Sequence, residues 1–390
     1  MKTFIKNGQT VTPDRIINGC VVVKDGKILE CGYTGEIPYD ASVIDAGGDY
    51  IMPGFVEVHV HGGGGFDYMD GTVEAFNAVS KVHREHGTTT ILPTTVACSF
   101  DSMVRVFDTY RKVLSQNTII NYGGLHLEGP FISMEMKGAQ NPEYVRCPSR
   151  KEVDAILEAG GDVIRKCTVA PEIDGIPYLA EEMQKHGISL SSGHSNGTYS
   201  DIEKGFDMGI RHITHMYSNT PSVRKINQVM YAGIIEAAYS IDGMCIELIG
   251  DGHHLPKEVL RMALKIKGAD KINLTSDAMR AAGTDVTESF LGECKPENRV
   301  IIEDGVAKLP DRSFYAGSIT TGDKMLRWAV LDCGVSLCDA SKLLCLSPAR
   351  NAGLDKCKGR LKAGKDADII FVDSKLNVTQ TFLKSDFMQK

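Results

Sequence analysis

The feature that most constrains the fold is a repeated alternation of short apolar runs with helical stretches through the middle of the chain. Eight runs have the length of strands, and they cover residues 54–59, 89–94, 123–128, 166–171, 188–193, 212–215, 245–250 and 271–276. Helical stretches lie between most of them, for example over residues 73–86, 102–115, 151–159, 178–186, 200–208 and 256–267. Eight strands with intervening helices predict an α/β fold that closes into a (β/α)8 TIM barrel. A doubly wound open sheet is the alternative, but it would not bring the first and eighth strands together.

The two ends of the chain are rich in short β segments. Residues 4–6, 20–23 and 27–30 are β-rich, and Asp25-Gly26 is a hairpin turn signal between the last two. Residues 367–373 are the clearest strand near the other end. We therefore expect a small β-sandwich domain from residues 1–52 and 347–390, beside a catalytic barrel domain over residues 53–346. A further hairpin is expected around Asp304-Gly305, near the barrel mouth.

Composition and charge argue against several classes of function. The formal net charge of -7 disfavours a nucleic-acid partner, since no basic stripe is present to bind phosphate backbones. No apolar stretch approaches the roughly 18 residues of a membrane span, and the opening segment MKTFIKNGQTV lacks the apolar core of a signal peptide. The 11 cysteines are scattered without a CxxC pair, so we expect reduced thiols. The expectation is a cytoplasmic protein that binds neither nucleic acid nor membranes.

Two histidines follow the first apolar run, in the segment MPGFVEVHVHGGGG. His59 and His61 are two residues apart, so their side chains share one face of a strand and both imidazoles can reach one cation. The glycines at residues 62–65 let the backbone turn sharply and let a substrate approach closely. A His-x-His pair alone is a weak signal, and this context makes it a candidate pair of metal ligands.

Four more polar residues end later apolar runs. Glu128 ends LHLE, His194 follows SLSSG, His215 ends HITH, and Asp277 follows INLTS. Imidazole and carboxylate groups gathered at neighbouring strand ends predict a metal site at one mouth of the barrel. A carboxylate such as Asp277, beside a metal, can take a proton from water and later pass it to a leaving amine. The alternatives are a capping or salt-bridged Glu128 and an Asp277 that caps the following turn.

These motifs, in this order, resemble the N-acetylglucosamine-6-phosphate deacetylase family of the amidohydrolase superfamily. The likeness runs over nearly the whole chain, through VIDAGGDYIMPGFVEVHVHGGGG, HLEGPF, KGAQNP, TVAPE, SSGHSNGTY, THMYS, GDGHH, TSDAMRAAG, SPAR and LKAGKDADIIFVD. HLEGP, GHSNGTY and TSDAM together are specific, whereas PGFxExHxH marks only the superfamily. The resemblance implies a hydrolase that converts N-acetylglucosamine 6-phosphate to glucosamine 6-phosphate and acetate.

The resemblance also assigns the metal ligands. Glu128, His194 and His215 would hold the family's principal metal. His59 and His61 match the two-metal variety of the family, in which Glu128 would bridge the ions. The implied cofactor is a divalent transition metal such as zinc, iron or manganese, with one or two ions per subunit, because these ligand types accept several metals.

Two further roles follow from the resemblance. Asp277 matches the family's catalytic aspartate. His254, in the loop GDGHHLP, matches a histidine that contacts the sugar phosphate from the neighbouring subunit, which implies a homodimer.

Three segments depart from the family pattern. Gln140 in KGAQNP stands where some members place a histidine that polarises the acyl carbonyl, and glutamine can donate a hydrogen bond but carries no charge. Ser218 and Asn219 replace the start of the family's Asn-Ala-Met. The family's phosphate-gripping arginine falls at Asn227, so Arg224, three residues earlier, is the expected substitute. The predicted substrate contacts are Gln140, Ser218, Asn219, His254 and Arg224.

Several alternatives stay open. Another N-acyl amino sugar, or a small N-acyl amine, would need the same chemistry. A cyclic-amide hydrolase is disfavoured, because such enzymes often use a carboxylated lysine at the end of the fourth strand to bridge two metals, and here Lys166 stands at the start of that strand. A deaminase is disfavoured because the His–Glu pair typical of deaminases does not follow the ligands. A metal-free scaffold barrel is disfavoured because such relatives usually lose their metal ligands.

Overall fold

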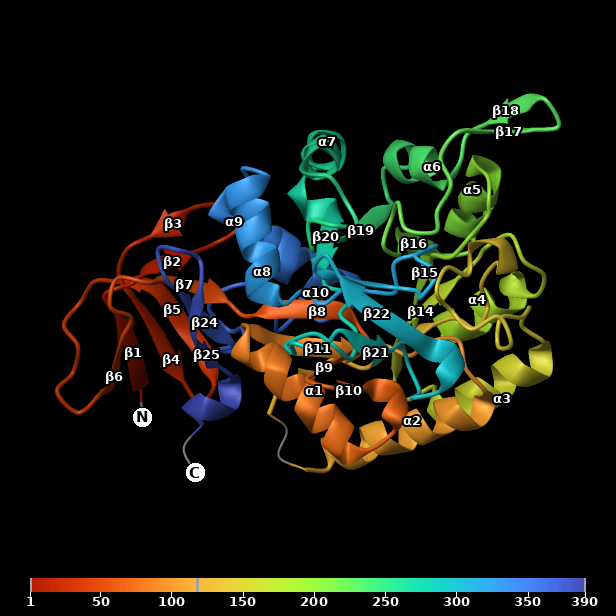
Figure 1. The fold of residues 1–390 in the computed structure, drawn as a ribbon. Coiled ribbons are helices and arrows are strands. Elements are labelled where there is room, and N and C mark those ends of the chain that lie inside the picture. The colour runs from red at the N-terminus through yellow and green to blue at the C-terminus, as the bar shows by residue number, and fades with distance from the viewer. Residues whose placement is uncertain (1, 117–118, 389–390) are drawn as a thin grey trace.

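The computed structural model describes residues 2–116 and 119–388. Its centre is a TIM-barrel-like domain of parallel strands and surrounding helices (Figure 1). The barrel strands are β8 (Phe55–Val60), β11 (Thr88–Pro93), β13 (Leu125–Glu128), β14 (Ile164–Val169), β15 (Ser189–Ser192), β16 (Ile210–Ile213), β19 (Cys245–Ile249) and β20 (Ile272–Thr275). Each overlaps one of the eight apolar runs, so the prediction of an α/β fold with a TIM-barrel-like domain is confirmed.

Hydrogen bonds connect these strands edge to edge. One parallel sheet has the order β13-β14-β15-β16-β19-β20, and β11 pairs in parallel with β8. Isolated parallel bridges join the two sheets, between Thr94 and His126 at one edge and between Val60 and Ala278 at the other. The first and last barrel strands therefore meet, which does not happen in a doubly wound open sheet.

Six helices overlap the six predicted helical stretches. They are α1 (Val73–Glu85), α2 (Phe100–Leu114), α3 (Arg150–Gly160), α4 (Ile176–Lys185), α5 (Tyr199–Asp207) and α7 (Lys257–Lys267). Side-chain caps start several of them: Ser99 accepts a hydrogen bond from Ser102 N, and Ser149 accepts one from Glu152 N. The shorter helices were not expected from the sequence; they are α6 (Ile234–Ser240), α8 (Gly322–Arg327), α9 (Leu337–Ser341) and α10 (Ser347–Asn351).

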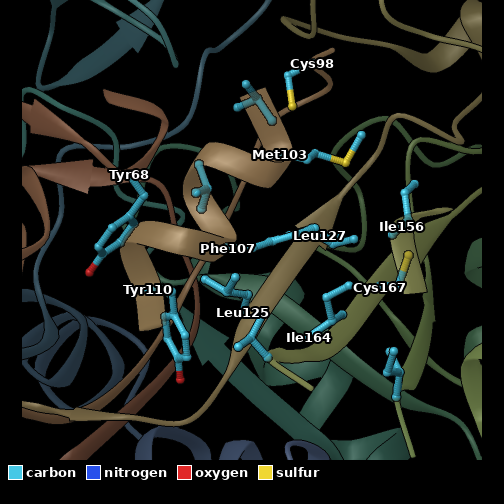
Figure 2. Packing of buried hydrophobic residues seen from close by; sticks show 14 of the residues in the cluster. Tyr68, Cys98, Met103, Phe107, Tyr110, Leu125, Leu127, Ile156, Ile164 and Cys167 are labelled. Atoms are coloured by element: carbon cyan, nitrogen blue, oxygen red, sulfur yellow. The ribbon is translucent and has the colours of Figure 1, made fainter. Parts of the chain in front are cut away.

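The largest hydrophobic cluster lies between the barrel strands and helices α2 and α3. Figure 2 shows Phe107 of α2 packed among buried side chains that include Leu125 and Leu127 of β13. Because successive side chains of a strand point to opposite faces, His126 and Glu128 face the barrel interior. His126 Nε2 accordingly lies 2.7 Å from Thr168 Oγ1 of the adjacent strand β14. Burial of the two leucines thus aims Glu128 into the barrel.

Two smaller sheets lie outside the barrel, one built from N-terminal strands alone and one that combines strands from both ends of the chain. One has the order β5 (Lys27–Tyr33), β4 (Cys20–Lys24), β1 (Lys2–Lys6), β6 (Ser42–Asp45). The other has the order β25 (Val378–Phe382), β24 (Ile369–Val372), β7 (Tyr50–Pro53), β2 (Gln9–Val11), β3 (Ile16–Ile17). Because β24 pairs antiparallel with β7, the C-terminal strands lie beside the N-terminal ones, on one side of the barrel (Figure 1).

Two further antiparallel elements lie outside the barrel strands and the terminal sheets. The first is β17 (Arg224–Ile226) with β18 (Val229–Tyr231), which projects from the body of the molecule in Figure 1. The second, after β20, consists of β21 (Glu288–Phe290), β22 (Arg299–Glu303) and β23 (Val306–Lys308), and it includes the predicted hairpin turn. Across residues 2–116 and 119–388, none of the helices combines the length and apolarity needed to cross a membrane.

Candidate metal centre

Six predicted site residues lie at the carboxyl ends of five barrel strands. His59 is in β8 and His61 just after it, while Glu128 is the last residue of β13. The other three, His194, His215 and Asp277, each follow the end of a strand by two residues, after β15, β16 and β20 respectively. All six are buried. The carboxyl ends of barrel strands meet at one face, which is where barrel enzymes carry their active sites.

The carboxylate of Glu128 lies at the middle of this cluster. Its Oε1 atom is 2.8 Å from His215 Nε2, 3.2 Å from His194 Nε2 and 3.3 Å from His59 Nε2. Its Oε2 atom is 3.3 Å from His61 Nε2. The result is two groups able to hold an ion, His59–His61–Glu128 and Glu128–His194–His215, which share the glutamate.

Hydrogen bonds at the far ring nitrogens fix the tautomers of two histidines. His194 Nδ1 lies 2.8 Å from the Met136 carbonyl oxygen, and His215 Nδ1 lies 3.1 Å from the Ser218 carbonyl oxygen. A carbonyl oxygen only accepts, so each Nδ1 carries the hydrogen and each neutral ring presents a lone pair at Nε2. These Nε2 atoms are 3.1 Å apart and both face Glu128. Two lone pairs and a carboxylate oxygen converge there, and a metal cation fits such a donor set.

The other half of the centre is organised differently. The Nε2 atoms of His59 and His61 are 3.3 Å apart. Their Nδ1 atoms are buried and have no hydrogen-bond partner among the described residues. Asp277 Oδ1 lies 3.2 Å from His61 Nε2 and 3.4 Å from His59 Nε2. Asp277 is therefore placed at the edge of the centre, beside this histidine pair.

Mutual interactions set the charges of the acidic groups. Burial alone would raise the pKa of Glu128, but the imidazoles of His59 and His194 outweigh it and hold the pKa well below its ordinary value. The same balance lowers the pKa of Asp277, whose partners are His59 and His61. Burial disfavours the charged form of His61, yet hydrogen bonds to Asp277 and Glu128 raise its pKa well above the ordinary value. Both carboxyls are ionised at neutral pH, as ligation and proton acceptance require.

Three of these residues adopt a backbone conformation that side chains rarely take. The φ angles of His194, His215 and Asp277 are 47°, 27° and 49°. Such left-handed conformations cost about 1–3 kcal/mol each and cluster at functional sites. Backbone hydrogen bonds hold them, including the one from Asp277 N to the His59 carbonyl oxygen at 3.1 Å. The strand ends thus turn sharply enough to aim these side chains at Glu128.

Gln140 contacts one of the candidate metal ligands directly. Its Nε2 atom donates to Glu128 Oε2 at 2.7 Å, and its Oε1 atom accepts from Ala97 N at 2.7 Å. The bond from Ala97 defines which end of the amide is the oxygen, so the nitrogen must face the carboxylate. Gln140 therefore orients Glu128, a role that the KGAQNP motif did not reveal.

A cavity of about 500 Å³ opens over the candidate metal ligands, within the size range of small-molecule sites. Its lining includes four of the predicted substrate contacts: Gln140, Ser218, Asn219 and His254. Arg224 is not among the lining residues, and its guanidinium donates to the Asn196 carbonyl oxygen. The substrate assignments of these residues stay predictions.

Sequence reasoning did not find several residues that line the cavity or hold a lining residue from behind, as Asp251 does. Asp251 Oδ2 lies 2.7 Å from His254 Nδ1, and this contact orients the ring. Their spacing of three residues in GDGHH could have indicated the pair. Leu291, Arg312, Ser313, Phe314 and Tyr315 come from the segment that follows β20. No motif marks these five, because their position depends on how that segment folds over the barrel.

Comparisons with known proteins agree with this geometry. The model of the amidohydrolase family matches residues 50–389. The chain is 30% identical over 366 residues to N-acetylglucosamine-6-phosphate deacetylase of Lysinibacillus sphaericus, covering 93% of this chain and 91% of that protein.

Solved structures give the same result over the whole chain. The crystal structure of N-acetylglucosamine-6-phosphate deacetylase from Pasteurella multocida has a TM-score of 0.91 at 26% identity, with 98% of each chain covered. A mutant of the Mycobacterium smegmatis deacetylase in complex with N-acetyl-D-glucosamine-6-phosphate has a TM-score of 0.88 at 27% identity, again with 98% of each chain covered. The chain belongs to the N-acetylglucosamine-6-phosphate deacetylases of the amidohydrolase family.

Proposed function

We propose that this protein is a metal-dependent deacetylase that hydrolyses the acetamide of N-acetylglucosamine 6-phosphate to glucosamine 6-phosphate and acetate. Family membership supports the reaction, and the similar M. smegmatis enzyme is solved with this sugar phosphate. The observation that carries the proposal is the position of Glu128 between two histidine pairs, with Asp277 at their edge. This arrangement combines an ion-binding centre with an ionised proton acceptor.

The donor set fits a divalent transition metal, and zinc, iron and manganese are the candidates. When bound, such an ion supplies Lewis acidity and lowers the pKa of water from near 16 to about 7. Asp277 takes the proton of the attacking water and later gives it to the departing nitrogen. Gln140 holds Glu128 in place through its amide nitrogen, and the second hydrogen on that nitrogen is available to the substrate carbonyl.

We propose that each subunit would hold two ions, one with His59 and His61 and one with His194 and His215, with Glu128 as a ligand common to both groups. The two ligand groups that share this glutamate support that number. The Glu128–His194–His215 group is the tighter of the two sites in this proposal. Its imidazoles donate from Nδ1 to carbonyl oxygens, and such bonds strengthen histidine ligands.

We propose that the protein is a homodimer joined through the β17–β18 hairpin. The hairpin projects in Figure 1 and exposes Val229, Met230 and Tyr231. Apolar side chains gathered on an exposed projection are typical of interaction surfaces. A cytoplasmic location completes the proposal, supported by 11 free cysteines in the described part of the chain.

We also propose that the terminal sheets form a small β-sandwich domain over residues 1–52 and 347–390, with the catalytic barrel over residues 53–346. A single apolar cluster supports the sandwich, because it combines Ile5 and Val21 of one sheet with Ile51 and Phe371 of the other. Helix α10 falls inside this boundary although it contacts β8 and β20 of the barrel. Residues 1, 389 and 390 of the proposed domain lie outside the described residues.

A substrate panel tests the proposed reaction. Acetate release is measured with N-acetylglucosamine, N-acetylgalactosamine and N-acetylmannosamine, each with and without a 6-phosphate, on protein loaded with zinc, iron or manganese. The highest kcat/KM is expected for N-acetylglucosamine 6-phosphate. Preference for an unphosphorylated sugar would overturn the proposed substrate but leave the proposed deacetylation intact. If no metal-loaded sample releases acetate from any sugar, the deacetylase proposal is wrong.

A further inference from the structure

We infer that Arg312 is the residue of this chain that binds the phosphate of the substrate. The inference rests on the proposed function, because it assigns the group that recognises one end of the proposed sugar phosphate. Among the described residues that line the cavity over the metal ligands, Arg312 is the single arginine or lysine. A phosphate group carries close to two negative charges at neutral pH, and a guanidinium is well suited to hold it.

The guanidinium of Arg312 is held by a neighbouring carboxylate. Its Nε atom donates to Glu303 Oε2 at 3.0 Å, and its Nη2 atom donates to Glu303 Oε1 at 3.1 Å. These bonds use two of the five N–H groups. No hydrogen bond reaches Nη1 from the part of the chain that the structure describes. The side chain of Arg312 is 58% exposed, so a ligand in the cavity can reach that edge.

Glu303 is shared by two cations, because Lys308 also contacts it and pairs with Asp304 as well. Lys308 Nζ lies 3.3 Å from Glu303 Oε2 and 2.7 Å from Asp304 Oδ2. The two hydrogen bonds to the Glu303 carboxylate thus fix the plane of the Arg312 guanidinium. A pre-oriented arginine loses less side-chain freedom when it binds a ligand.

The turn that carries Arg312 is tied down on both sides. Arg312 has a φ of 61°, a left-handed conformation that is uncommon for a residue with a long side chain. Its backbone N–H donates to the Leu309 carbonyl oxygen at 2.8 Å, and Leu309 N donates to the Phe314 carbonyl oxygen at 3.0 Å. Ser313 Oγ donates to Asp311 Oδ1 at 2.6 Å. This closed turn directs Arg312 and Ser313 to the cavity.

The same turn contacts the loop of His254. The ring of Tyr315 packs edge-on against the ring of His254, with centroids 4.8 Å apart. The carboxylate of Asp251 fixes His254 Nδ1 as a donor, at 2.7 Å. The segment after β20 therefore brings Arg312 to the cavity wall that also carries His254. By contrast, Arg224 of the β17–β18 hairpin donates to the Asn196 carbonyl oxygen and does not line the cavity of its own chain.

Steady-state kinetics of Arg312→Gln test this assignment. The readout is the preference for phosphate, defined as kcat/KM for N-acetylglucosamine 6-phosphate divided by kcat/KM for N-acetylglucosamine. We expect this ratio to fall about 10- to 100-fold, the loss typical of a removed hydrogen bond to a charged group. Arg312→Lys should recover part of it. Arg299→Gln is the matched control, since Arg299 pairs with Glu288 in the same segment and does not line the cavity.

Two outcomes would overturn the assignment. In the first, Arg312→Gln lowers both kcat/KM values equally, which indicates a structural role for the arginine. In the second, Arg224→Gln removes the preference for phosphate while Arg312→Gln retains it, which assigns the phosphate to the hairpin.

A binding measurement separates this inference from the proposed function. Glucose 6-phosphate has the phosphate but no amide, so calorimetric titration of the metal-loaded protein with it, and with glucose, reports the phosphate contact alone. Wild-type protein should bind glucose 6-phosphate about 10- to 100-fold more tightly than Arg312→Gln does. If wild-type protein binds the phosphate in this way but releases no acetate from any sugar, the deacetylase proposal fails and the Arg312 site stands. Equal binding by the two proteins would refute the Arg312 site, whatever the activity.

Discussion

Single atoms determine the chemistry of the metal centre. The Nδ1 hydrogens of His194 and His215 are committed to carbonyl oxygens, so both Nε2 lone pairs face the position of an ion. Asp277 lies beside the other histidine pair and is ionised, because His59 and His61 outweigh the effect of burial on its pKa. In the proposed function, ligation and proton transfer therefore belong to different residues that meet at one edge.

This division predicts the behaviour of Asp277→Asn. The amide keeps the shape of the side chain but cannot accept the proton of the attacking water. We expect kcat to fall about 10²- to 10⁴-fold, while the metal content stays that of the wild-type protein. Acetate release and elemental analysis of the same sample measure the two quantities.

A surface substitution controls for general damage. Asp270 forms an ion pair with Arg350 away from the cavity, so Asp270→Asn should keep normal kcat. Near-normal turnover by Asp277→Asn would end the assigned role of this residue.

At the scale of elements, an ion pair inside the barrel links two strands that are not neighbours in the sheet. Lys166 Nζ of β14 lies 2.5 Å and 2.8 Å from the two carboxylate oxygens of Glu247 in β19. The strands β15 and β16 lie between them, and Lys166 and Glu247 are 5% and 1% exposed. Removing one member of such a pair leaves a buried charge without a partner. The free energy of unfolding then falls far more than when both members are replaced by apolar residues.

The corresponding prediction concerns stability. Lys166→Met alone should lower the free energy of unfolding by about 3–5 kcal/mol. The double variant Lys166→Met with Glu247→Leu should lose much less, because both charges are gone. Urea denaturation of the variants measures the difference.

An exposed pair offers the comparison. Arg299 and Glu288 are about half exposed, so Arg299→Gln should change stability by about 0–1 kcal/mol. If the free energy of unfolding falls equally in the single Lys166 variant and in the double variant, Lys166 and Glu247 do not act as a coupled buried ion pair.

At the scale of the whole molecule, the β17–β18 hairpin is the projection on which the proposed dimer depends (Figure 1). Met230 is 62% exposed at this hairpin. A charge at the centre of an apolar interface is costly, so Met230→Glu should convert a dimer to a monomer. Light scattering coupled to size exclusion should give twice the chain mass of 42.5 kDa for wild-type protein and one chain mass for the variant.

Another exposed methionine provides the control for this test. Met262 on α7 is 41% exposed, and Met262→Glu should leave the dimer unchanged. A monomeric wild-type protein, or a Met230→Glu variant that remains dimeric, would refute the proposed interface.

Local pattern accounts for the parts of the fold that sequence predicted well. Apolar runs such as LHLE are short, and their alternation encodes which face is buried, so Leu125 and Leu127 determine the inward direction of Glu128. The ends of those runs also predict His194, His215 and Asp277 as candidate site residues. Helices α6 and α8–α10 were missed because 5–7 residues carry too little periodicity to stand out.

Contacts between distant segments lie beyond such patterns. The bond from Gln140 to Glu128, the pairing of Lys166 with Glu247 and the position of Arg312 at the cavity all join elements whose relative placement depends on the closed barrel. The local alternation of side chains predicts the order of the strands and helices and the candidate ligands at the strand ends. Which of those groups touch, which carry protons and which cation faces the cavity were settled by three-dimensional packing, because such contacts depend on distances that no short stretch of sequence specifies.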